Sequence, residues 1–165
     1  MRDALRFLTV IPVGGAARPM TARAAVWFPV VGALLGLLGA AVNQLPVPGR
    51  VRALLVLAAW ALVTGALHED GLADTFDAFG GGRTREDVLR ILKDSRIGAY
   101  GALALVFSLL IRWEALAGAS TATLVAAQSL PRAGMVALAW LAGPATEGLG
   151  GAWAASLRWW RCHYR

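Results

Sequence analysis

The chain has 165 residues, of which 58% are apolar, and its mean hydropathy of +0.59 is too high for a typical soluble domain of this length. The net charge of +6 comes from arginines and one lysine that are dispersed between apolar stretches, which argues against nucleic acid as a partner. A single cysteine, Cys162, excludes an intramolecular disulfide, and no Cys/His spacing resembles a zinc site. These features indicate a single integral membrane domain over residues 1–165.

Residues 1–23 are expected to form an interfacial N-terminal segment. The apolar stretch at 5–13 is short, carries Arg6 and is broken by Pro12, so it fits a cleaved signal peptide poorly. The uncharged run at 24–49 is long enough to cross a bilayer, and we predict the first membrane span there.

Three further stretches are apolar enough to be spans, although each is shorter or interrupted by a charge. They cover residues 52–67, 97–114 and 119–143. The many alanines and glycines are typical of membrane helices that pack closely. We therefore predict an all-α, polytopic helix bundle of about four spans in a lipid bilayer; a homo-oligomer stays open.

The cations give a topology, because Lys and Arg near span ends are retained on the cytoplasmic side. Four spans place most of them on one side, namely Arg2, Arg6, Arg18, Arg23, Arg83, Arg85, Arg90, Lys93, Arg96, Arg158, Arg161 and Arg165, and leave Arg50, Arg52 and Arg112 on the other. Both termini and the polar segment 68–96 are thus expected to face the cytoplasm. The atypical tail at 156–165, with two tryptophans among arginines, suits a membrane interface.

Seven of the ten acidic residues lie in the polar segment 68–96. The three glycines at 80–82 predict a break after a helix end. Thr84, with a carboxylate three positions later at Asp87, matches a helix-capping pattern. We expect a short amphipathic cytoplasmic helix from there to about Lys93.

Asp70, Asp74 and Asp77 have the spacing that places three side chains on one stripe of a helix. Like charges at this spacing destabilise a helix unless a cation holds them together. Magnesium prefers oxygen ligands and is typically held by a few carboxylates together with the phosphates of a substrate. We predict an Mg²⁺ site at these three aspartates, with Glu69, on another side of the helix, as an additional candidate.

A second polar group lies at the other end of the segment. Asp94 is expected to complete the site as a further ligand or a base, and the neighbouring Lys93 and Arg96 would stabilise charge on a transferring phosphoryl group. The alternative is a solvated loop whose charges keep it wet. The apolar residues Leu72 and Phe76 alternate with the aspartates in a helical pattern, which favours a site.

Arg132 falls inside the fourth predicted span, directly after Pro131. A guanidinium group is costly in a membrane and usually faces the bundle interior or a water-filled cavity, where a phosphate is a suitable partner. The alternative is a span that breaks at Pro131, with Arg132 reaching the surface. Both arrangements stay open.

Two motifs together resemble one known family. E-D-G-L-A-D-T-F-D at 69–77 and K-D-S-R-I-G-A-Y-G at 93–101 are similar to the cobalamin synthase family, the adenosylcobinamide-GDP ribazoletransferases or cobalamin 5′-phosphate synthases. The opening at 5–13 and the W-F-P-V-V-G start of the first span at 27–32 resemble the same family at the same places. The match runs to about residue 155.

The resemblance implies an Mg²⁺-dependent membrane transferase in the cytoplasmic (inner) membrane of a bacterium or archaeon. It would join a corrinoid nucleotide, adenosylcobinamide-GDP, to α-ribazole or its 5′-phosphate and release GMP, in the last steps of cobalamin biosynthesis. Ser95, Gly98 and Arg132 are then expected to bind substrate. Family members continue beyond this point with a glycine-rich T-G-D type motif, so we expect this chain to be C-terminally shortened.

Two other classes stay as alternatives. A CDP-alcohol phosphotransferase also has a D-G-x-x-A start, but its motif has an arginine where this chain has Asp74, and a distant D-x-x-x-D pair that is missing here. A divalent-cation transporter would place its carboxylates near the bilayer midplane, and a non-catalytic membrane subunit would need no site at all.

Overall fold

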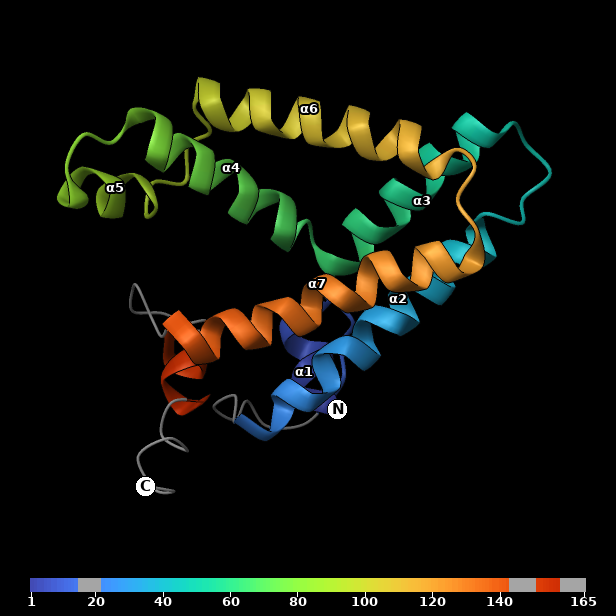
Figure 1. The fold of residues 1–165 in the computed structure, drawn as a ribbon, viewed down its shortest axis with the longest axis horizontal. Coiled ribbons are helices and arrows are strands. Elements are labelled where there is room, and N and C mark those ends of the chain that lie inside the picture. The colour runs from blue at the N-terminus through green and yellow to red at the C-terminus, as the bar shows by residue number, and fades with distance from the viewer. Residues whose placement is uncertain (15–21, 143–150, 158–165) are drawn as a thin grey trace. The chain divides into compact units, whose positions relative to one another are not determined.

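The computed structural model describes residues 1–14, 22–142 and 151–157, and the regular structure in these ranges is helical, with no strand (Figure 1). The helices are α1 (Arg2–Leu8), η1 (Ala22–Trp27), α2 (Phe28–Val42), α3 (Gly49–Thr64), α4 (Leu67–Gly81), α5 (Arg85–Ile91), α6 (Ala99–Leu116) and α7 (Thr121–Ala142). Residues 151–157 are also helical. The predicted all-α class is confirmed; the tail at 158–165 and residues 15–21 of the N-terminal segment lie outside the described residues.

Among the described residues, three helical segments are long and apolar enough to cross a membrane, namely Ala22–Val42, Ala99–Leu116 and Thr121–Ala142, with mean hydropathies of 2.1, 1.5 and 1.3. Helices α3 and α4 are apolar enough together but meet at an angle of 89°. They add a fourth span if they count as one broken span. The prediction of a membrane protein with about four spans is therefore confirmed.

The chain divides into two compact units, one of Met1–Ala41 with Ser120–Arg165 and the other of Val42–Ala119. In the first unit, α2 lies along α7 (Figure 1), and two glycines of α2 allow the close approach. A Cβ atom on Gly32 would collide with the backbone at Gln128, and one on Gly36 would collide with the backbone at Val125. Small residues at such crossings bring membrane helices into van der Waals contact.

An aromatic stack ties α1 to the start of α2 in the same unit. The Phe28 ring lies 5.6 Å from the Phe7 ring and 4.8 Å from the Trp153 ring, measured between centroids. Ala4 and Leu8 of α1 are fully buried. The short N-terminal helix is therefore packed through one apolar face.

Arg132 is buried in this unit, with 3% of its surface exposed. Helix α7 continues through Pro131, and the Nη1 atom of Arg132 donates hydrogen bonds to the main-chain oxygen and to Oε1 of Gln128, at 2.7 and 2.6 Å. Of the two arrangements considered above, the break at Pro131 is wrong and the inward-facing guanidinium agrees with the structure.

The second unit contains α3 to α6, with α4 running beside α6 (Figure 1). The bend between α3 and α4 lies at Gly65 and Ala66, with φ values of 63° and 54°. The left-handed region suits glycine, whereas an alanine there is costly and is kept only by its surroundings. The turn fixes the direction in which α4 leaves α3.

Helix α4 continues through Gly80 and Gly81 and is capped by Gly82, so the predicted glycine break is displaced to its last position. The capping pattern that follows is confirmed, because the hydroxyl of Thr84 accepts a hydrogen bond from the main-chain nitrogen of Asp87 at 3.1 Å. Helix α5 therefore begins where the sequence predicts.

Candidate functional site

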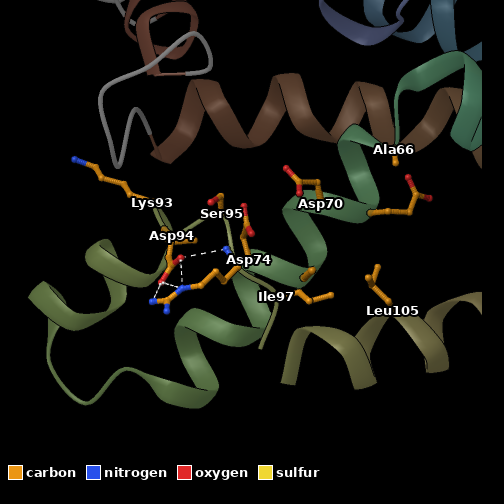
Figure 2. A pocket seen from close by; sticks show the side chains of 12 residues that line it. Ala66, Asp70, Asp74, Lys93, Asp94, Ser95, Ile97 and Leu105 are labelled. Carbon is orange, nitrogen blue, oxygen red and sulfur yellow. Dashed lines mark hydrogen bonds and ion pairs between the residues drawn. The ribbon is translucent and has the colours of Figure 1, made fainter. Parts of the chain in front are cut away.

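A cavity of about 430 Å³ lies in the second unit, between α4 and the loop that joins α5 to α6. Helix α4 and the turn before it, the 92–97 loop and one side chain of α6 line it, as Figure 2 shows, with Ala66, Glu69, Asp70, Ala73, Asp74, Leu92, Lys93, Asp94, Ser95, Arg96, Ile97 and Leu105. Both polar motifs of the sequence thus contribute to one cavity.

The α4 wall carries two carboxylates one helical turn apart. Asp70 is exposed and Asp74 is half-buried, and both project from the side of α4 that lines the cavity (Figure 2). The buried Ala73 between them packs that stretch of the helix into the fold. Two acidic groups on one face create a region that attracts cations.

The loop wall carries an ion pair between Asp94 and Arg96. The Nε and Nη2 atoms of Arg96 donate to Oδ1 and Oδ2 of Asp94 at 3.0 and 2.7 Å, and the Arg96 main-chain nitrogen donates to Oδ1 at 3.1 Å. The side-chain hydrogen bond from Arg96 is the largest cause that lowers the pKa of Asp94 to about 2. The same bond raises the pKa of Arg96, so the pair stays charged at neutral pH.

Lys93 and Ser95 flank the ion pair and also line the cavity. In Figure 2 the Lys93 side chain extends away from Asp70 and Asp74. The loop wall of the cavity thus carries two cations and a hydroxyl, and the α4 wall carries carboxylates.

Glu69 lines the cavity as well, but it has a partner on α6. Its Oε1 atom accepts from Nη2 of Arg112 at 2.9 Å, and the Glu69 side chain is only 19% exposed. The sequence interpretation placed Arg112 on the outer side of the membrane and missed this contact. An arginine inside a span was the available signal, because such a group needs an acidic partner.

Asp77 does not line the cavity. It is 9% exposed, and its two oxygens accept hydrogen bonds from the main-chain nitrogens of Gly98 and Gly101 at 2.7 and 2.8 Å. Neither Asp77 nor Gly98 lines the cavity, and Arg132 belongs to the other unit. The structure thus brings together seven of the ten residues proposed from the sequence, namely Glu69, Asp70, Asp74, Lys93, Asp94, Ser95 and Arg96.

The sequence model of cobalamin-5-phosphate synthases matches residues 1–164 of this chain. The chain belongs to the cobalamin-5-phosphate synthase family. This confirms the family resemblance that the motifs at 69–77 and 93–101 suggest.

Relatives in three bacteria carry the name adenosylcobinamide-GDP ribazoletransferase. The one from Bradyrhizobium diazoefficiens is 49% identical over 88% of this chain and 60% of its own length, and that from Azorhizobium caulinodans is 49% identical over 84% and 59%. One from Shewanella baltica is 55% identical over 57% of this chain and 37% of its own length. The chain thus spans about 60% of the first two relatives. No solved structure matches it.

In this member of the cobalamin-5-phosphate synthase family, the residues that can hold a metal at the cavity are Asp70 and Asp74. Within residues 1–14, 22–142 and 151–157, no three His, Cys, Asp or Glu side chains gather closely enough to hold a metal ion by themselves. Magnesium usually keeps several waters and binds one or two carboxylates together with substrate phosphates. A pair of carboxylates in a cavity with cations opposite fits that habit.

Proposed function

We propose that this chain catalyses the joining of adenosylcobinamide-GDP to α-ribazole, or to its 5′-phosphate, with release of GMP. Family membership and the names of the relatives support this reaction. The observation that carries it is one cavity lined both by Asp70 and Asp74 on α4 and by the Lys93 to Arg96 loop. Carboxylates and cations that share one small cavity suit a diphosphate with a metal ion.

The cavity would hold the diphosphate of the corrinoid nucleotide. Arg96 is 87% exposed although it is paired with Asp94, so its guanidinium can approach a phosphate while Asp94 fixes its direction. Lys93 and the Ser95 hydroxyl would add further contacts. A bound magnesium ion, held by Asp70 and Asp74, would supply positive charge to the leaving GMP.

In the proposed reaction a hydroxyl oxygen of the ribazole attacks the corrinoid-side phosphorus. The bond from that phosphorus to the oxygen of GMP breaks, and GMP leaves with the electron pair while the hydroxyl proton passes to water or a carboxylate. Asp94, with a pKa of about 2, is a weak base at neutral pH. We therefore assign it the orientation of Arg96 rather than proton abstraction.

The proposed setting is the cytoplasmic membrane of a bacterium or archaeon, with the 92–97 loop on the cytoplasmic side. The cations around α5, at Arg83, Arg85 and Arg90, support this orientation. Corrinoid nucleotide and ribazole would then reach the cavity from the cytoplasm.

The test is GMP release by the protein in lipid vesicles, with adenosylcobinamide-GDP, α-ribazole and Mg²⁺ supplied. We expect Asp74→Asn to lower the rate by about 10²–10³-fold, because charge on the leaving group then loses part of its stabilisation. Glu86→Gln is the matched control, since Glu86 is exposed on α5 outside the cavity and should leave the rate unchanged. Full Mg²⁺-dependent release by Asp74→Asn would remove the metal role, and no release by the unaltered chain would remove the proposed reaction.

One observation keeps cation transport as the second candidate. Glu69 on α4 pairs with Arg112 of the candidate span α6, so a carboxylate lies beside a candidate membrane helix. Uptake of Mg²⁺ into the same vesicles, measured with an entrapped indicator and without nucleotide, separates the two. Uptake that Asp74→Asn abolishes, in the absence of GMP release, would favour transport.

A further inference from the structure

We propose that Asp77 is a positioning residue that fastens the start of α6, and with it the cavity loop, to α4. The consequence for catalysis rests on the proposed function, whereas the structural role does not. Asp77 shares a helical stripe with Asp70 and Asp74, yet its surroundings differ from theirs.

The first observation is how α6 begins. Its N-cap residue is Gly98, which has no side chain, and the first amide groups of any helix lack partners within the helix. In a capping box, side chains of the same helix satisfy the amides of the N-cap and the third residue. Here the carboxylate of Asp77, from another helix, accepts from those same two positions, Gly98 and Gly101. A negative charge at a helix N-terminus is also favoured by the helix dipole.

The second observation is that both residues that donate to this carboxylate are glycines. The three atoms nearest a Cβ on Gly98 would all belong to the Asp77 carboxylate, with Cγ at 2.8 Å. The φ of Gly98 is −97°, which other residues also adopt, so space and not backbone conformation calls for glycine here. A Cβ on Gly101 would meet the same carboxylate and the main-chain oxygen of Ala73 at 2.8 Å.

Asp77 and Gly98 are close in sequence to residues that line the cavity, so their contact affects the cavity walls. Asp77 lies less than one turn beyond Asp74, and Gly98 follows Arg96 and Ile97, which line the cavity. The hydrogen bonds from Gly98 and Gly101 therefore fix the loop wall relative to the α4 wall. At the start of the loop, the main-chain nitrogens of Lys93 and Asp94 donate hydrogen bonds to main-chain oxygens of α5.

Hydrogen exchange tests the structural part without any need for activity. We expect the amide protons of Gly98 and Gly101 to exchange at least about tenfold faster in Asp77→Ala than in the unaltered protein, because their acceptor is lost. Asp77→Asn should lie in between, since asparagine is also a good helix cap. Unchanged exchange in Asp77→Ala would overturn the proposal.

A double substitution gives a second structural test. Gly98→Ala should lower the unfolding midpoint in detergent when Asp77 is present, and it should have much less effect in an Asp77→Ala background, where the obstructing carboxylate is gone. Gly71→Ala on α4 is the matched control, because no atom lies within 4 Å of a Cβ placed there. An equal drop in the unfolding midpoint on Gly98→Ala in both backgrounds would contradict the contact between Gly98 and Asp77.

Kinetics separate positioning from metal binding. If Asp77 positions the loop, Asp77→Asn lowers kcat by about tenfold through misplacement, while the Mg²⁺ concentration for half-maximal GMP release stays within twofold. Asp74→Asn should raise that concentration instead. An equal rise in that Mg²⁺ concentration in both variants, with exchange of the Gly98 and Gly101 amides unchanged in Asp77→Asn, would make Asp77 a metal ligand. Loss of GMP release in all proteins would overturn the proposed reaction and leave the two structural tests to decide this proposal.

Discussion

The acidic residues of the α4 to α6 segment differ in their partners rather than in their chemistry. Glu69 is paired with Arg112, Asp94 with Arg96, and Asp77 with two main-chain amides. Asp70 and Asp74 line the cavity from one side of α4. Partners therefore divide one acidic cluster into structural, orienting and metal-binding candidates.

Asp94 gives a prediction about pH. Its folded pKa of about 2 lies below the ordinary value of 3.8, so the ion pair contributes stability above about pH 4 and loses it as the pH falls through about 2. Between about pH 5.5 and 8.5 the ionisation of Asp94 therefore does not change. We expect Asp94→Asn to slow GMP release by roughly tenfold or more, because Arg96 loses its bidentate partner.

The measurement is the rate of GMP release by the unaltered protein divided by the rate of Asp94→Asn, across that pH range. A constant ratio agrees with an orienting role for Asp94. A ratio that rises with pH, following one titrating group, would contradict it and identify Asp94 as the base. Asp87→Asn is the control, because Asp87 pairs with Arg90 on α5 and its pKa is also lowered, but it does not line the cavity.

Spacing alone predicted the stripe of Asp70, Asp74 and Asp77 but not its division. A helical wheel shows which residues share a face, and it contains no information on what covers each level of that face. The far end of the stripe meets the start of α6, and the near end faces the cavity. The pairing of Glu69 with Arg112 joins residues 43 positions apart, a distance over which local patterns carry no signal.

At the scale of helices, hydropathy located the spans and misplaced several ends. The run predicted at 24–49 is helical only to Val42, and Pro46 and Pro48 lie in the turn that follows. This turn is uncharged and largely apolar, so hydropathy does not distinguish it from the span. The bend at Ala66 was equally hidden, because its positive φ depends on the surrounding packing.

The packing of α2 on α7 gives a prediction at this scale. We expect Gly36→Ala to destabilise the protein by about 1–3 kcal/mol, because the added Cβ meets the backbone at Val125 and Leu124, which cannot rotate away. Gly134→Ala on α7 adds the same group where no atom lies within 4 Å, and it should be neutral or stabilising by up to about 1 kcal/mol.

Unfolding in mixed micelles with increasing SDS measures both variants. The comparison is matched in chemistry and in membrane-helix context, so only the space around the Cβ differs. A Gly36→Ala protein as stable as Gly134→Ala would show that α2 and α7 are not in close contact.

For the whole molecule, the Glu69–Arg112 contact changes the predicted topology of the polar segment. The sequence placed Arg112 outside and residues 68–96 in the cytoplasm, yet the two side chains are 2.9 Å apart. Along α6, the contacts of α4 run from Gly101 to Arg112, a rise of about 16 Å. If α6 spans the bilayer, α4 extends into the membrane beside it, and we propose that only its far end, with α5 and the loop, is cytoplasmic.

Labelling of single cysteines tests this arrangement in cells. In a Cys162→Ser background, Leu45→Cys and Gly118→Cys lie in the turns before α3 and after α6, and we expect both to react with a membrane-impermeant maleimide from outside. Arg85→Cys on α5 should react only after the membrane is permeabilised, because cations near span ends stay in the cytoplasm. Glu69→Cys would report the depth of α4, and we expect it to react slowly from either side while Arg85→Cys reacts fast in permeabilised cells. Labelling of Arg85→Cys from outside would show that the topology is the reverse of the one proposed. Rapid labelling of Glu69→Cys from the cytoplasm would show that the start of α4 lies in water rather than in the membrane.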